Sequence, residues 1–171
     1  NRRHLPRPRC ALHPGRSRND RHNTQPPENE TMSRTQYRVT VSNLGEVYAG
    51  GNTRAALAEF NHYKRASLDD QGRASAESVT LWTDGEPTRE FEPVVYDCEL
   101  TDTFAGEANY SWVKRAALIY KDQPTDRKLT QDAKRALGLT AHRCRRDDYQ
   151  DTIQLDPIGW CQRAFITRRD V

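Results

Sequence analysis

The stretch that decides the fold is PTDRKLTQDAKRALGL, residues 124–139, because it specifies a helix together with both of its ends. Thr125 is a good N-cap, and Asp126 in the first turn suits the positive end of the helix dipole. Gly138 stands where helices commonly end in a left-handed residue. An apolar stripe runs between these ends, formed by Leu129, Ala133, Ala136 and Leu137. The sequence therefore predicts a helix over about 125–137.

Strand patterns flank this helix on both sides. Two strands are predicted before it, at 94–100 and 110–120, although residues 114–117 would also suit a helix. Three more are predicted after it, at 142–146, 152–155 and 160–167, with a turn at 156–159. Strands on both sides of one helix favour antiparallel α+β layers over a doubly wound parallel sheet.

The first half of the chain repeats this order of elements. A strand at 37–41 and a short partner at 46–48 precede a helix that Asn52 or Thr53 caps and that runs to about Leu68. Strands at 78–83 and 87–91 follow, joined by an Asp-Gly hairpin turn. The predicted fold class is therefore α+β, with two β-β-α-β-β-like halves, mainly antiparallel sheets and one helix in each half.

The predicted organisation is a basic tail over 1–36, a small ββαββ unit over 37–92 and an α+β unit over 93–171. Each half is small for a stable core, so we expect the two sheets to pack together or the protein to form a homodimer. Residues 1–31 hold seven of the 27 Lys and Arg residues, five of the nine prolines and no aromatic residue. Such a segment is predicted to be disordered.

Met32 is the only methionine, and the chain changes composition abruptly there. Codons for the residues just before Met32 could spell a bacterial ribosome-binding sequence, so one hypothesis is that translation begins at Met32. The alternative is a disordered basic arm that grips phosphates. The remaining chain carries 20 basic and 21 acidic residues, so the excess of positive charge belongs to the tail.

No apolar run reaches the ~18 residues that a membrane span needs. The N-terminus also lacks the apolar core of a secretory signal. The four cysteines, at positions 10, 98, 144 and 161, form no closely spaced pair. We therefore expect reduced thiols and a cytoplasmic location, in a bacterial host, without membrane association.

The most distinctive segment is DTFAGEANYSW, residues 102–112, which combines an acid, an amide and aromatic residues around a glycine. It resembles stretches in small uncharacterised proteins of bacteriophages and related mobile elements. The resemblance implies a provenance and no known activity. Phe104, Tyr110 and Trp112 are interpreted as core aromatics, and the alternative is that the segment binds a partner.

Two arrangements could hold a metal. Asp97, Glu99, Asp102 and Glu107 offer oxygen ligands for a divalent cation, but a solvated strand face is the favoured interpretation, because alternation of acidic and apolar residues needs no other explanation. Cys98, Cys144, Cys161 and His142 could form a zinc site, but buried thiols in strands are favoured because zinc ligands usually come in close pairs. We predict no metal, no cofactor and no catalytic residue.

Arginines cluster near the C-terminus and could form a basic patch with Tyr149. The cluster comprises Arg143, Arg145, Arg146, Arg163, Arg168 and Arg169. Asp147, Asp148 and Asp151 lie among them, so a mixed-charge surface is the favoured interpretation.

The leading hypothesis is a small non-enzymatic accessory protein of a phage or mobile element that binds a host or phage protein. The alternative is a nucleic-acid-binding protein that uses the C-terminal arginines and aromatic residues. A metal-dependent enzyme using the 97–107 carboxylates is the third. The candidate binding residues are Asp102, Glu107, Asn109, Tyr110, Arg143, Arg145 and Arg146.

Overall fold

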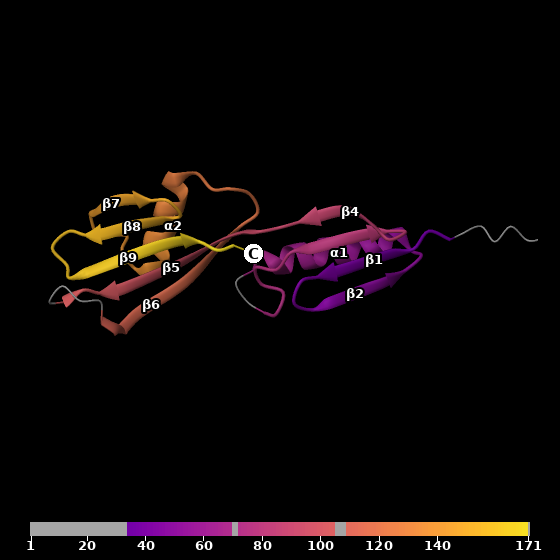
Figure 1. Cartoon of the computed structure of the whole chain (residues 1–171), viewed down its shortest axis with the longest axis horizontal. Helices are drawn as coiled ribbons and strands as arrows, with labels where there is room; N and C mark the ends of the chain where they lie inside the picture. The colour runs from indigo at the N-terminus through magenta and orange to yellow at the C-terminus, as the bar shows by residue number, and fades with distance from the viewer. Residues whose placement is uncertain (1–33, 70–71, 105–108, 171) are drawn as a thin grey trace, which may run out of the picture. The chain divides into compact units, whose positions relative to one another are not determined.

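The computed structural model describes residues 34–69, 72–104 and 109–170, which form two antiparallel sheets with one helix each (Figure 1). The predicted α+β class is thereby confirmed. The predictions of a disordered segment and of a start at Met32 concern residues outside the described ranges. Neither described helix has the length and apolar character that crossing a lipid bilayer requires.

The first sheet has four strands in the order β2-β1-β3-β4, all paired antiparallel. Its strands are β1 (Tyr37–Val41), β2 (Gly45–Gly50), β3 (Val79–Thr83) and β4 (Glu86–Phe91). Each overlaps a strand predicted from the sequence, at 37–41, 46–48, 78–83 and 87–91. Asp84 and Gly85 both have positive φ, as the tight turn between β3 and β4 demands.

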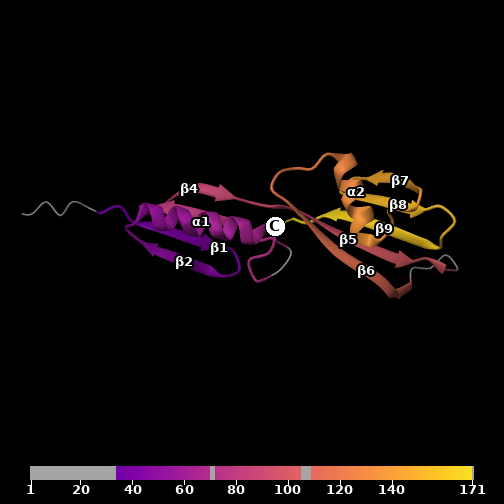
Figure 2. The same ribbon diagram turned by 180° about the vertical axis from the view of Figure 1, so that it is seen from behind.

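Helix α1 (Thr53–Ser67) lies on one face of this sheet (Figure 2). It begins where the sequence indicates, because the Asn52 side chain accepts hydrogen bonds from the backbone N–H groups of Arg54 and Ala55 at 3.0 and 3.2 Å. Phe60 packs into the core of this layer with residues of β1 and β3. The buried cluster is Val39, Val41, Ala56, Phe60, Ala74, Val79, Leu81 and Phe91.

The second sheet has five strands in the order β6-β5-β9-β8-β7, again all antiparallel. Its strands are β5 (Val94–Asp102), β6 (Asn109–Tyr120), β7 (Cys144–Tyr149), β8 (Thr152–Pro157) and β9 (Gln162–Arg168). Residues 114–117 belong to β6, so the helical alternative for them is wrong. In this sheet the last strand, β9, pairs with the first, β5. In the four-stranded sheet the first strand, β1, pairs with β3, the strand that directly follows α1.

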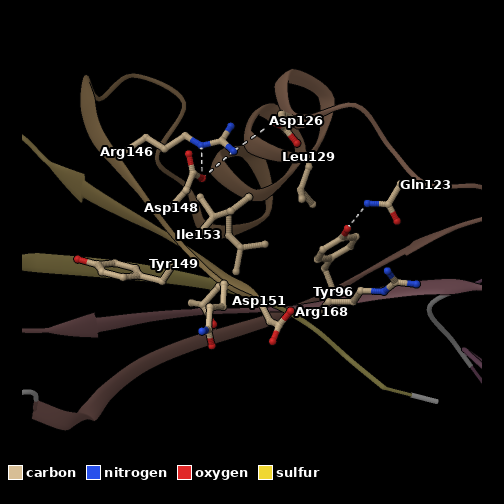
Figure 3. A pocket seen from close by; sticks show the side chains of 13 residues that line it. Tyr96, Gln123, Asp126, Leu129, Arg146, Asp148, Tyr149, Asp151, Ile153 and Arg168 are labelled. Atoms are coloured by element: carbon tan, nitrogen blue, oxygen red, sulfur yellow. Dashed lines mark hydrogen bonds and ion pairs between the residues drawn. The ribbon is translucent and has the colours of Figure 1, made fainter.

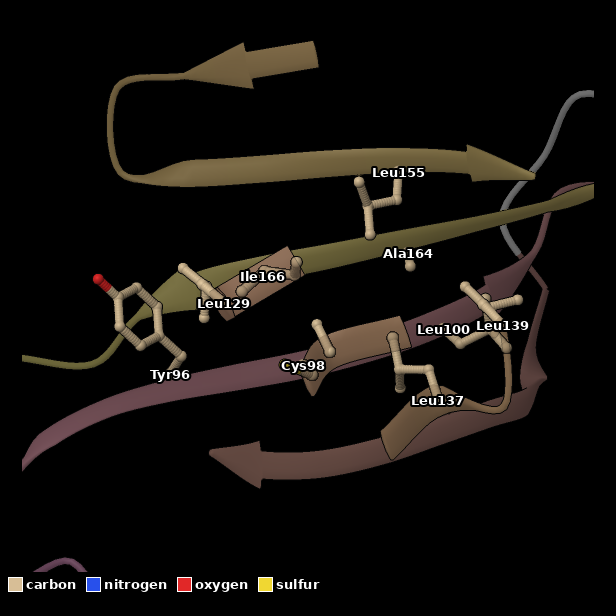
Figure 4. Close-up of a cluster of buried hydrophobic side chains, with 10 residues drawn as sticks. Tyr96, Cys98, Leu100, Leu129, Leu137, Leu139, Leu155, Ala164 and Ile166 are labelled. Carbon is tan, nitrogen blue, oxygen red and sulfur yellow. The ribbon is translucent and has the colours of Figure 1, made fainter. Parts of the chain in front are cut away.

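Helix α2 (Asp126–Leu137) covers one face of the five-stranded sheet and has both predicted ends. The Thr125 hydroxyl accepts the backbone N–H of Lys128 at 3.3 Å, and Gly138 is left-handed with φ of 81°. Leu129, Ala133 and Leu137 meet the alternate residues of β5, β8 and β9 that point toward the helix (Figure 4). This core contains Tyr96, Cys98, Leu100, Leu129, Ala133, Leu137, Leu139, Leu155, Ala164 and Ile166.

The turn predicted at 156–159 is displaced along the chain. Pro157 is the last residue of β8, where it pairs with Cys144, and the turn is closed by a hydrogen bond from Trp160 N–H to the Pro157 carbonyl at 3.3 Å. Gly159 has φ of 82° and takes the third position of this turn rather than the fourth. Trp160 therefore lies in the turn and not in strand β9, where the sequence pattern had placed it.

Candidate functional site

One end of the five-stranded sheet gathers segments that are far apart in the sequence. Antiparallel pairing places Asp102 at the end of β5 opposite Gln162 at the start of β9 and opposite Asn109 at the start of β6. It likewise places Pro157 at the end of β8 opposite Cys144 at the start of β7. We call this edge, with the residues that directly follow or precede these strand ends, the loop end of the sheet (Figure 1).

Hydrogen bonds join the connecting segments at the loop end. Thr103 N–H donates to the Cys161 carbonyl at 2.8 Å, so the segment after β5 is tied to the turn between β8 and β9. Ile158 N–H donates to the Arg143 carbonyl at 2.8 Å, which ties the same turn to the residue before β7. Backbone bonds of this kind fix the position of the turn relative to the sheet.

Large apolar side chains are exposed on these joined segments. Phe104 is 71% exposed, Ile158 63% and Trp160 52%. The interpretation of Phe104 as a core aromatic is therefore wrong, because the chain leaves β5 two residues earlier and carries it outward. We call Phe104, His142, Ile158 and Trp160 the loop-end patch.

His142 holds Trp160 at the surface. The centroids of their rings are 4.1 Å apart with an angle of 61° between the planes, which is an edge-to-face contact. The backbone carbonyl of His142 accepts the Lys134 ammonium at the C-terminal end of α2. The tryptophan thus has one side packed against a residue that is itself anchored to the helix, while about half of its surface stays open.

The structure brings only part of the predicted binding residues to the loop end. Asp102 and Arg143 both lie there, and the Asp102 carboxylate accepts the backbone N–H of Phe104 at 2.8 Å. Asn109 and Tyr110 begin strand β6 at the same end, although the description of β6 side chains starts at Lys114. Glu107 lies outside the described residues.

Arg145 and Arg146 lie within β7, on opposite faces of the strand. Arg145 points away from α2 and contacts Asp147 and Asp156, each at 3.0 Å. Asp156 also contacts Arg163 at 2.9 Å from the neighbouring strand. Burial raises the pKa of Asp156, but hydrogen bonds from Arg163 and Gln154 and the charges of the two arginines outweigh it, so the pKa lies below its ordinary value.

Arg146 points toward α2 and lines a pocket of about 480 Å³ (Figure 3). Its guanidinium contacts Asp148 at 2.8 Å and Asp126 at 3.5 Å, and it donates to the Thr130 hydroxyl at 3.0 Å. Across the pocket, the Gln123 amide donates to the Tyr96 hydroxyl at 2.6 Å. These polar groups satisfy one another, which is typical of a surface ion-pair network and not of a poised acid–base pair.

Two acidic residues of β5, Asp97 and Glu99, are also held by arginines. Asp97 binds the Arg169 guanidinium at 3.0 Å, and Glu99 lies 3.5 Å from that of Arg115. Within the described residues, no group of three or more histidine, cysteine or acidic side chains could hold a metal ion. The mixed-charge interpretation of the arginine cluster fits this arrangement better than a continuous basic patch.

The described cysteines have different environments. Cys98 is buried in the core, and desolvation, with a smaller contribution from the charge of Asp97, raises its pKa to about 12. Cys144 is partly buried, and Cys161 is exposed in the turn after β8. The interpretation of all three as buried strand thiols is therefore wrong for Cys161.

Sequence reasoning missed Ile158 and Trp160 as surface residues. A signal was available, because Gly159 separates them and is suited to the left-handed position of a turn. The strand pattern ahead of Gln162 hid that signal by extending β9 too far toward the N-terminus.

Comparison with known proteins gives no match: no protein-family model, no curated protein and no solved structure is similar to this chain.

Proposed function

We propose that this chain is a non-enzymatic binding protein whose partner is another protein, and that the loop-end patch is the surface that contacts it. The single observation that carries the proposal is the exposure of Phe104, Ile158 and Trp160 on segments that hydrogen bonds tie together. An apolar group displayed on a fixed support loses little conformational entropy when it is buried in a complex.

The composition of the loop end matches that of a protein interface. Tryptophan anchors are enriched among the residues that dominate binding energy, and a polar rim commonly surrounds such anchors. Here Asp102 accepts a hydrogen bond from the backbone of Phe104, and Arg143, which is exposed, accepts one from the backbone of Ile158. The chemistry that fits is a partner with an apolar pocket for Trp160 and Ile158 and polar groups at its margin.

The nucleic-acid alternative finds less support. Single-stranded nucleic acid binding requires a basic groove with aromatic side chains along it. In this chain Arg145, Arg146 and Arg163 are each occupied by aspartates. The resemblance of 102–112 to phage and mobile-element proteins is the reason to seek the partner among phage or bacterial host proteins.

Comparative affinity capture tests the proposal. The full chain and its Trp160→Ala and Ile158→Asp variants are used as baits in lysate of phage-infected bacteria, and the captured proteins are quantified by mass spectrometry. Tyr149→Ala is the matched control, because Tyr149 is also an exposed aromatic residue, at the opposite end of β7. We expect one partner to be retained by the control and lost from both patch variants.

The candidate must then bind the purified full chain directly. A partner that binds wild type and both patch variants equally would contradict the assignment of the loop-end patch. Specific retention of single-stranded nucleic acid instead of protein would favour the alternative function.

A further inference from the structure

Sheet edges differ in how well they are protected against pairing with another strand. In the four-stranded sheet, β4 contains Pro87 and several exposed charged residues, and β2 has an irregular register with β1. In the five-stranded sheet, β7 carries charges at four of its six positions. Charged residues, prolines and bulges are the usual means of blocking an edge.

Strand β6 lacks these means over its last five residues, which follow the charged pair Lys114 and Arg115 and lie beyond the irregular register near Asp102. It is the longest strand, with 12 residues, and no strand of the described part of the chain pairs with its outer side. From Ala116 to Tyr120 it has neither a charge nor a proline, in the sequence Ala-Ala-Leu-Ile-Tyr. Backbone N–H and C=O groups along this outer side need partners, and the uncharged part of this edge, Ala116–Tyr120, is a template for another strand.

We propose that β6 pairs with β6 of a second copy, antiparallel and centred on Ala117, so that two five-stranded sheets join into one. This inference is independent of the proposed function, because the loop-end patch belongs to other segments of the sheet. A two-fold axis perpendicular to the sheet keeps the α2 helices of both copies on the same face.

The sequence of β6 favours a second copy centred on this residue. Pairing about Ala117 places Lys114 opposite Tyr120 and Arg115 opposite Ile119, so no charged residue of β6 stands directly opposite another. Centring on Arg115 would instead set like charges directly opposite each other, which destabilises a strand pair. Arg115 is already paired with Glu99 of its own sheet, so its charge is balanced in the joined sheet.

The surface beside β6 also suits pairing with a second copy of the chain. A groove of about 450 Å³ runs between β6 and α2, with apolar walls from Leu118, Ile119 and Ala136. On the helix, Lys128 and Arg135 both contact Asp132, at 2.6 and 3.1 Å, so the charges of the groove are balanced within each copy. Two such grooves side by side would bury apolar surface without placing an unpaired charge at the junction.

Charge substitutions at the proposed axis test the pairing directly. The oligomeric state of the full chain is measured by sedimentation velocity over a concentration series, for wild type, Ala117→Lys and Ala117→Glu. Ala117 is exposed, so either side chain fits a folded monomer. Ala49→Lys is the matched control, since Ala49 is an exposed alanine on the edge strand β2.

We expect wild type and Ala49→Lys to dimerise with the same affinity and each Ala117 variant to weaken dimerisation by at least about tenfold, because like charges meet at the axis. An equimolar mixture of the two Ala117 variants should form a heterodimer, detected by native mass spectrometry. A monomeric wild type would overturn the proposal. So would an Ala117→Lys protein that dimerises like wild type, or a mixture that forms no heterodimer.

Discussion

Asp156 on β8 and Arg163 on β9 face each other across the sheet, with 2.9 Å between the carboxylate Oδ1 and the guanidinium Nε. Arg145 approaches the same carboxylate from β7 at 3.0 Å. The aspartate therefore links three neighbouring strands. Because these contacts favour the ionised form, the pKa of Asp156 is lower in the folded protein than in the unfolded chain.

This arrangement predicts how stability depends on pH. A lowered folded pKa stabilises the protein above the unfolded pKa of Asp, about 3.9, and this contribution is lost as pH falls through the folded pKa. The free energy of unfolding of wild type should exceed that of Asp156→Asn above about pH 5, and the difference should shrink below about pH 4. Denaturant melts over this range measure it, and a constant difference would contradict the role of Asp156.

Thiol reactivity should separate Cys161 from Cys98. Alkylation by iodoacetamide at about pH 8 requires a thiolate that the reagent can reach. Cys161 is exposed, whereas Cys98 is buried with a pKa of about 12. Peptide mapping by mass spectrometry should find Cys161 modified in the native protein and Cys98 modified only in denaturant. Early modification of Cys98 would show that the core around it is open.

Gly138→Ala should destabilise the protein by roughly 1–2 kcal/mol, the cost of a left-handed conformation for a residue with a Cβ atom. Its φ is 81°, and a Cβ atom there would also lie 3.3 Å from the Lys114 ammonium, which can move aside. Gly51→Ala is the control, because the nearest atom to its Cβ would be the Thr35 carbonyl at an ordinary 3.5 Å. Equal unfolding midpoints for the two variants would contradict this account of the α2 terminus.

The interpretation of Trp112 as a core aromatic concerns a side chain outside the part of the chain that the structure describes, so it stays a prediction. If Trp112 packs in the core, the Trp112→Ala substitution should lower the free energy of unfolding by about 3–5 kcal/mol. Tyr149→Ala serves as the comparison, because Tyr149 is exposed and surface substitutions usually change stability by no more than about 0.5 kcal/mol. A Trp112→Ala midpoint equal to that of wild type would contradict the core interpretation and add Trp112 to the binding candidates.

The elements of this fold could be predicted because their signals are local. The ends of α2 follow from Thr125 and Gly138, and the start of α1 follows from Asn52. Thr125 and Asn52 accept hydrogen bonds from free backbone N–H groups of the first helical turn, and Gly138 adopts the left-handed conformation that ends a helix. The strand β1 follows from simple alternation.

The candidate site could be predicted only in part, because it depends on pairing between distant segments. Nothing local to Asp102 indicates that Gln162 lies opposite it, and nothing local to Phe104 indicates that the turn at Ile158 is its neighbour. Sequence spacing likewise shows arginines beside aspartates without showing which pairs form. Register across a sheet is set by the whole core, so it becomes visible only in the folded chain.

The most direct test of the proposed function is the affinity of the captured partner for Trp160→Ala, measured by isothermal titration calorimetry beside wild type and Tyr149→Ala. Trp160 is half exposed in a turn, so the free energy of unfolding of the Trp160→Ala variant should stay within ~0.5–1 kcal/mol of that of wild type. We predict that Trp160→Ala weakens binding by at least about thirtyfold, the effect of removing a central aromatic anchor worth about 2 kcal/mol, while Tyr149→Ala binds as wild type does. Equal affinities for all three folded proteins would contradict the account of the loop-end patch.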